Sequence, residues 1–246
     1  MREVITLPDG RAAQYWDNGL DGPAVVFFHG CPDTRHAAMT GAPAAAALGV
    51  RLVAVNRPGY GLSTRHASTQ SSVADDTVRV ADLLGIDRFA ALGMSVGTAY
   101  ALVCAARHPD RVRALGLAAG PDGRRQERGT VEEVVARFRP ELEEWVARVR
   151  PDDPDDHALS DRFLADLPPA DATLLRATRT PAEVAASVRE ALADHDGYLR
   201  DAALTFRPWD AGLDDVRCPV RTWPDDRERH FSILLAGWPE ILAALR

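Results

Sequence analysis

The stretch Phe89-Ala90-Ala91-Leu92-Gly93-Met94-Ser95-Val96-Gly97-Thr98-Ala99-Tyr100-Ala101-Leu102 decides the fold. Its first half is a short apolar run, which is typical of a buried strand, and its apolar residues after Gly97 have helical spacing. The turn between the two halves must be sharp and must push Ser95 toward strained backbone angles, so Gly93 and Gly97 leave room for it. We therefore predict a strand, a tight turn and a helix, with the Ser95 hydroxyl exposed at the helix N-terminus.

Strand and helix patterns alternate around this stretch. Strand-like runs lie at residues 3–7, 11–16, 24–28, 51–55 and 114–118. The first two runs alternate in polarity and are separated by Pro8-Asp9-Gly10, which indicates an antiparallel hairpin at the edge of the sheet. Helix patterns at residues 34–48 and 73–84 connect later strands, although Gly41 and Pro43 interrupt the first of them. This alternation predicts an α/β fold with a mostly parallel sheet and helices on both faces.

The pattern changes after Gly120-Pro121-Asp122-Gly123. Residues 124–207 show charged amphipathic helices and no strand pattern, and two of the helices begin with capping-box sequences at Thr130 and Thr180. A weak strand pattern returns at 216–222, and a last amphipathic helix follows at 232–245. We predict a core in residues 1–123, a helical cap insertion in 124–207, and a shortened C-terminal part of the core in 208–246.

The composition excludes several classes of function. The chain has 246 residues, with 36 acidic and 29 basic residues, and every basic residue is arginine because the sequence contains no lysine. A Schiff-base lysine, a Ser-Lys dyad and a Walker A loop are therefore impossible. The mildly acidic balance argues against a nucleic-acid or membrane partner, and three scattered cysteines argue against a disulfide framework or a zinc site. We expect a small-molecule substrate and neither a cofactor nor a metal ion, and the sequence leaves the oligomeric state open.

The start of the chain carries no apolar targeting segment. Elsewhere, no apolar run approaches the roughly 20 residues that a membrane-spanning helix needs. Both observations lead us to expect a cytoplasmic protein.

Several motifs now occur in the order that one family requires, and the chain resembles the α/β-hydrolase family. The motifs that carry the resemblance are His29-Gly30-Cys31-Pro32, Asn56-Arg57-Pro58-Gly59-Tyr60-Gly61-Leu62-Ser63, the elbow Gly93 to Gly97, and His108-Pro109-Asp110-Arg111-Val112. The elbow matches the family's G-x-S-x-G nucleophile motif. The first motif is similar to that of proline iminopeptidase and esterase-like members, although Cys31 and Asp33 depart from the H-G-G-P-G form.

The resemblance implies acyl transfer. Ser95 would be the nucleophile, and the backbone amides of Cys31 and Val96 would bind the oxyanion. His230, just before the last helix, would be the general base. Because some relatives place an aspartate at the elbow, the serine argues against epoxide hydrolase or dehalogenase chemistry. The function predicted is hydrolysis of a small ester, lactone or amide.

Some of these residues have simpler interpretations. A serine between glycines often forms only a tight turn, and His230 could be a half-buried structural histidine. We interpret His29 as a residue that shapes its loop. Cys31 lies in an exposed loop and could be a reactive thiol, but its amide is the more useful group.

The usual triad acid has no clear counterpart. Only residues 221–229 separate the strand pattern that begins at Cys218 from His230, and this is too short for the strand and crossover helix that normally intervene. Either 218–222 begins the acid-bearing strand and joins the histidine loop directly, or 220–223 is itself the last strand, which we prefer. On the second interpretation the sheet has about seven strands.

Asp122 is the substitute acid that the fold suggests, because it follows the run 114–118 at the edge where site residues gather. The simpler interpretation is that its segment only forms a turn. A chain that lacks the acid could instead be a catalytically impaired homologue that binds a small ligand under its cap, and this is our alternative hypothesis.

Overall fold

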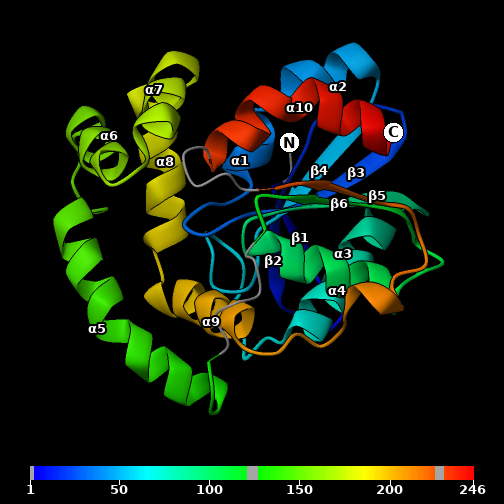
Figure 1. The fold of residues 1–246 in the computed structure, drawn as a ribbon, viewed down its shortest axis with the longest axis horizontal. Coiled ribbons are helices and arrows are strands. Elements are labelled where there is room, and N and C mark those ends of the chain that lie inside the picture. Colours follow the sequence, from blue (N-terminus) through cyan, green and yellow to red (C-terminus); the bar gives the residue numbers. More distant parts are fainter. Residues whose placement is uncertain (1–2, 121–126, 225–229) are drawn as a thin grey trace.

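A mostly parallel sheet forms the centre of the protein, with helices on both of its faces (Figure 1). The computed structural model describes residues 3–120, 127–224 and 230–246. Within these residues seven strands follow the order β1-β2-β4-β3-β5-β6-β7, namely Val4–Thr6 (β1), Ala12–Asp17 (β2), Ala24–Phe28 (β3), Arg51–Val55 (β4), Phe89–Met94 (β5), Val112–Ala118 (β6) and Val220–Trp223 (β7). Strands β1 and β2 are antiparallel to their neighbours, and β4, β3, β5, β6 and β7 are parallel. The predicted α/β class is confirmed.

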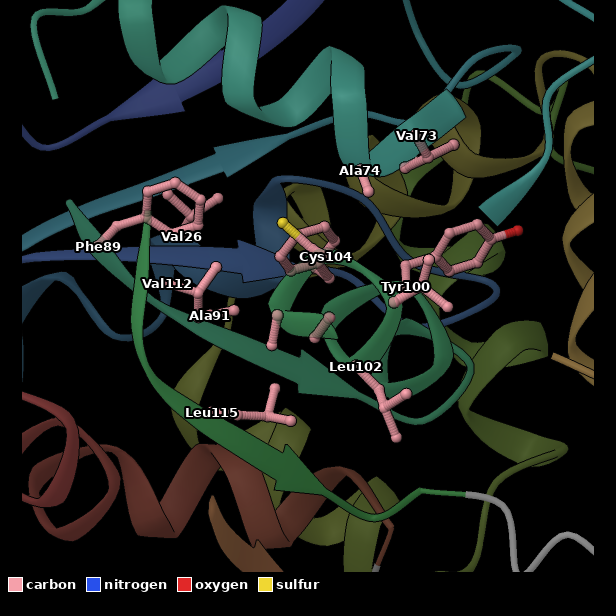
Figure 2. Close-up of a cluster of buried hydrophobic side chains, with 14 of the residues drawn as sticks. Val26, Val73, Ala74, Phe89, Ala91, Tyr100, Leu102, Cys104, Val112 and Leu115 are labelled. Carbon is pink, nitrogen blue, oxygen red and sulfur yellow. The ribbon is translucent and has the colours of Figure 1, made fainter. Parts of the chain in front are cut away.

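Helices α3 (Gln70–Leu83) and α4 (Gly97–Arg107) cover one face of the sheet. Figure 2 shows the core between α4 and the central strands, in which Phe89 and Ala91 of β5 belong to the same buried cluster as Tyr100 and Cys104 of α4. All four side chains are fully buried. The strand β5 is buried along its whole length, which explains why its sequence is a continuous apolar run.

The other face is covered by α1 (His36–Met39), α2 (Ala42–Leu48) and α10 (Phe231–Leu245). The sequence predicts one helix over 34–48, but the structure breaks it before Gly41. A Cβ atom at Gly41 would lie 2.6 Å from the Trp238 ring of α10, so only glycine allows this close approach.

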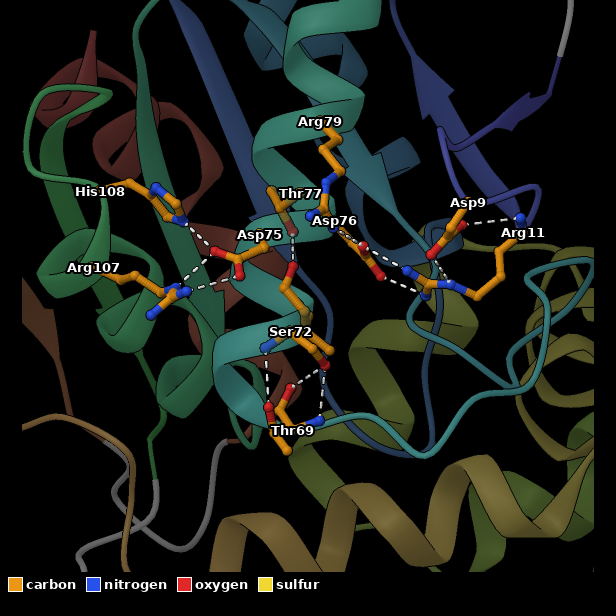
Figure 3. Close-up of polar contacts among 11 residues, drawn as sticks. Asp9, Arg11, Thr69, Ser72, Asp75, Asp76, Thr77, Arg79, Arg107 and His108 are labelled. Carbon is orange, nitrogen blue, oxygen red and sulfur yellow. Dashed lines mark hydrogen bonds and ion pairs between the residues drawn. The ribbon is translucent and has the colours of Figure 1, made fainter.

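Polar contacts fix the N-terminal end of α3 (Figure 3). The helix begins at Gln70, earlier than the predicted residue 73, because Thr69 and Ser72 form a reciprocal capping box.

Two adjacent aspartates then tie the body of α3 to its neighbours (Figure 3). Asp76 binds Arg11 of the first hairpin at 2.6 Å, and Asp75 accepts hydrogen bonds from Arg107 and His108 at the end of α4. The helix is therefore anchored to both the hairpin and α4.

In the part of the chain that the structure describes, five α-helices lie between β6 and β7: α5 (Val131–Val149), α6 (Asp156–Ala165), α7 (Pro169–Thr178), α8 (Pro181–Leu192) and α9 (His195–Phe206). We call them the helical insertion. Capping boxes begin α5 at Thr130 and α8 at Thr180, as the sequence predicts. The insertion has its own apolar core, which includes Tyr60 from the loop after β4 and packs against Phe231 of α10.

Strand β7 pairs in parallel with β6 and is the last strand among the described residues. This agrees with the preferred interpretation of residues 220–223. None of the helices that the structure describes is long and apolar enough to cross a membrane.

Candidate active site

The elbow between β5 and α4 places Ser95 in the left-handed region, with φ of 53°. Such a conformation costs a non-glycine residue on the order of 1 to 3 kcal/mol and needs support from its surroundings. The Ser95 amide donates to the carbonyl of Ala118 at 2.9 Å. The Ser95 carbonyl accepts from the amide and the hydroxyl of Thr98 at 3.0 and 2.6 Å. The turn is therefore held from β6 and from the first turn of α4.

The two flanking glycines allow this elbow to form. A Cβ atom at Gly93 would lie 2.5 Å from the carbonyl oxygen of Gly97, and one at Gly97 would lie 2.1 Å from the carbonyl oxygen of Phe28. Real Cβ atoms do not approach backbone oxygens so closely. The start of α4 consequently packs directly on the ends of β5 and β3.

The loop 29–32 lies beside Ser95. A Cβ atom at Gly30 would be 3.4 Å from the Cβ atom of Ser95, so the two backbones are neighbours. The amides of Cys31 and Val96 donate to no acceptor among the residues that the structure describes. The structure thus brings Ser95 and the loop of Cys31 together at the N-terminus of α4, where N–H groups are free to bind a negatively charged atom.

The carbonyl groups of the loop 29–32 are held by Arg57. Its guanidinium donates to the carbonyl oxygens of His29 at 2.6 Å and Gly30 at 3.1 Å. In a trans peptide the carbonyl and the next N–H point in opposite directions. The Cys31 N–H therefore points away from Arg57.

Arg57 is itself part of a buried ion pair. Its guanidinium lies 2.6 Å from the Asp201 carboxylate of α9, and both residues are at most 3% exposed. The hydroxyls of Tyr60 and Tyr100 each donate to Asp201 at 2.7 Å. Burial alone would lower the pKa of Arg57, but Asp201 raises it above its ordinary value. The pair links the helical insertion to the loop beside Ser95, and nothing in the sequence pattern of α9 predicts it.

His29 shapes the loop, as the sequence suggests. Burial, followed by the charge of Arg57, lowers the pKa of His29 well below its ordinary value, so the ring is neutral. Its Nε2 accepts from the Arg57 amide at 3.3 Å, and its Nδ1 lies 2.8 Å from the Gly30 oxygen. The buried neutral ring therefore joins the loop 29–32 to the loop of Arg57.

The sequence predicts that Cys31 lies in an exposed loop, but in the structure the residue is only partly exposed. The Tyr60 hydroxyl lies 3.5 Å from its Sγ, and burial raises the pKa of the thiol well above its ordinary value. A thiol with a raised pKa is a poor nucleophile, which favours the interpretation that the amide of Cys31 is its useful group.

His230 is the residue immediately before α10. It follows β7 in the chain as Ser95 follows β5, so both lie beyond the carboxyl ends of parallel strands. Within the described part of the chain, no hydrogen bond joins the Ser95 hydroxyl to the His230 ring. Asp122, the suggested acid, lies outside the described residues.

A groove of about 470 Å³ opens between α5 and α9. Phe138, Leu142, Trp145 and Tyr198 line it, and Glu141 and Arg148 stand among its polar residues. The nearby Cys31 thiol raises the pKa of Tyr198 above its ordinary value. One wall of the groove therefore reaches the loop beside Ser95.

Comparison with known proteins identifies the family. The family model described as alpha/beta hydrolase fold matches residues 23–200, and the chain belongs to this family.

Individual curated relatives match only part of the chain, at 30 to 33% identity. The chain is 33% identical to epoxide hydrolase B of Mycobacterium tuberculosis over a match of 94 residues. This match covers 37% of this chain and 26% of that protein. It is 30% identical to an epoxide hydrolase of Caballeronia sordidicola over a match of 156 residues. This match covers 62% of this chain and 47% of that protein. The matches thus span less than half of either curated relative. The enol-lactonase of Burkholderia xenovorans LB400 has a similar structure, with a TM-score of 0.65, 19% identity, and coverage of 98% of this chain and 97% of the other.

Proposed function

We propose that the protein hydrolyses a small uncharged ester, lactone or amide through an acyl-enzyme on Ser95. One observation carries the proposal: Ser95 sits at a strained elbow beside two backbone amides, those of Cys31 and Val96, that have no acceptor among the described residues. Unpaired amides beside a serine hydroxyl are suited to stabilise an oxyanion that forms on attack by that hydroxyl.

The proposed mechanism has two stages. The Ser95 oxygen attacks the acyl carbon while His230 accepts its proton, and the amides of Cys31 and Val96 hold the oxyanion of the tetrahedral intermediate. Collapse of this intermediate expels the alcohol or amine, which takes the proton from His230. A water molecule then attacks the acyl-enzyme in the same manner and releases the acid. Every proton that leaves a nucleophile thus returns to a leaving group.

We propose Asp122 as the acid that orients His230. The support is its position in the sequence shortly after β6, whose carboxyl end pairs with that of β5, the strand before Ser95. We expect Asp122→Asn to lower kcat by up to about four orders of magnitude if Asp122 has this role, since that is the effect known for a triad acid in a serine protease.

Two curated relatives carry the name epoxide hydrolase, but a serine nucleophile does not suit that reaction. Opening an epoxide with a carboxylate gives an ester, which water can hydrolyse. Opening it with the Ser95 hydroxyl would give an ether, which water cannot hydrolyse under the same conditions. We therefore propose ester-type substrates, with the apolar part bound along the groove between α5 and α9.

The test is hydrolysis of p-nitrophenyl butyrate and of a γ-lactone by the wild type and by Ser95→Ala. We expect turnover in the wild type and a loss of at least about four orders of magnitude in the variant, as for other serine hydrolases without their nucleophile. Equal rates in both proteins would refute the proposal. Binding of such compounds without turnover would favour a catalytically impaired homologue.

A further inference from the structure

The first turn of α10, which follows His230, has no cap of its own. Helix N-termini normally have their free N–H groups satisfied by a side chain at the N-cap, but His230 occupies this position and its side chain makes no capping bond. The first turn of α10 also contains no acidic residue. Some other group must therefore satisfy these N–H groups.

Asp171 of α7 supplies the missing cap. Its Oδ2 accepts hydrogen bonds from the amides of His230 at 2.8 Å and Phe231 at 3.0 Å. Its Oδ1 accepts from the amide of Ser232 at 2.9 Å and from the Ser232 hydroxyl at 2.5 Å. A single carboxylate from the helical insertion thus binds three successive amides at the start of α10.

The environment of Asp171 suits this contact. The residue is completely buried. Burial alone would raise the pKa of Asp171, but the hydrogen bonds from Ser232, His230 and Phe231 outweigh it and lower the pKa. The group is therefore an ionised carboxylate at the positive end of a helix, where negative charge is stabilising.

From this geometry we propose that Asp171 is the positioning residue for His230, so that the helical insertion controls where the general base stands. The proposal rests on the proposed function, in which His230 accepts the proton of Ser95. Asp171 holds the backbone amide of His230 itself, and a displacement of a catalytic group by about 1 Å can cost about a hundredfold in rate. Asp171 would act through His230 and would not touch the substrate.

The variant to make is Asp171→Asn, which keeps the shape of the side chain but replaces one acceptor oxygen with a donor. We expect kcat for p-nitrophenyl butyrate to fall about a hundredfold, with KM within about threefold of the wild type. The matched control is Asp155→Asn. Asp155 also caps a helix of the insertion, α6, through the amides of His157 and Ala158, and its replacement should leave kcat unchanged.

A double-mutant cycle separates positioning from general loss of structure. The rate at which a fluorophosphonate labels Ser95 is measured in His230→Ala with and without Asp171→Asn. If Asp171 acts through His230, the second change has no further effect in this background. An equal loss in both backgrounds would overturn the proposal, as would an unchanged kcat in Asp171→Asn alone.

If Asp171→Asn does not fold, Ser232→Ala provides the test. It removes one of the bonds to Asp171, and we expect a several-fold fall in kcat that disappears in the His230→Ala background. A fall of the same size in that background would overturn the proposal. Turnover that depends on Ser95 and His230 but not on Asp171 would refute this inference alone. Absence of any turnover dependent on Ser95 in the wild type would refute the proposed function and this inference with it.

Discussion

At the scale of the residue, Arg57 and Asp201 form an ion pair that is withdrawn from water. Removing one member of such a pair costs about 3 to 5 kcal/mol, because the other charge stays buried without compensation. We predict that Asp201→Asn lowers the free energy of unfolding by about this amount, and urea denaturation measures it. The variant also weakens the acceptor of the Tyr60 and Tyr100 hydroxyls.

Asp161→Asn is the control for this prediction. Asp161 pairs with Arg176 at 3.2 Å, but its side chain is 72% exposed. Exposed pairs contribute at most about 1 kcal/mol, so this variant should remain close to the wild type in stability. Similar decreases in the free energy of unfolding for Asp161→Asn and Asp201→Asn would show that burial does not make the Arg57 pair more important for stability.

Some residues of the candidate site could be predicted from sequence and others could not. Ser95 has a local signal, because two glycines and a change from strand to helix surround it. Asp171 and Asp201 have none, since each is one acidic residue among many in an amphipathic helix. Their partners lie 59 residues away for Asp171 and 144 for Asp201, and no local spacing encodes such contacts.

At the scale of the element, the joint between β3, β5 and α4 depends on glycine. We predict that Gly97→Ala destabilises the protein by about 3 kcal/mol or more, because its Cβ atom would lie 2.1 Å from the Phe28 oxygen and backbone cannot yield cheaply. The variant should also lose esterase activity, since the elbow would move. Thermal unfolding and ester hydrolysis are the measurements.

Gly212→Ala tests whether the effect comes from the contact. A Cβ atom at Gly212 would meet only the Asp215 carboxylate, at 3.9 Å, and its φ of −113° suits any residue. This variant should keep the stability and the activity of the wild type. A tolerated Gly97→Ala would mean that α4 does not pack on β3 as described.

The elements themselves were largely predictable, because their signals are local. The capping boxes at Thr130 and Thr180 mark the helices that the structure contains. Gly41 and Pro43 signal the interruption of the helix pattern over 34–48 locally, but the contact that requires glycine at 41 comes from Trp238, at the other end of the chain. No local pattern encodes that contact.

At the scale of the whole molecule, Glu190 of α8 joins the helical insertion to the sheet. Its carboxylate binds Arg35 at 3.1 Å and Asn56 at 2.7 Å. Burial alone would raise the pKa of Glu190, but hydrogen bonds from His36, Asn56 and Arg35 lower it to about 2, from an ordinary value of 4.5. Because the pKa is lower in the folded protein, the ionised group stabilises the fold above about pH 4.5, and this stabilisation is lost as the pH falls from there toward 2.

We therefore predict that Glu190→Gln is less stable than the wild type at pH 7, on the order of 2 kcal/mol after allowance for screening by solvent. The difference between the two proteins should shrink as the pH falls below about 4.5. Unfolding measured across this range checks it, with Glu144→Gln on the exposed side of α5 as the control. A difference that does not change with pH would contradict the assignment.

The central claim is that Ser95 is a nucleophile, and covalent labelling tests it most directly. The protein is incubated with a fluorophosphonate, digested and analysed by mass spectrometry. We predict one adduct per chain, on Ser95, which is absent in Ser95→Ala and forms much more slowly in His230→Ala. No adduct, or an adduct that survives the replacement of Ser95, would contradict the account.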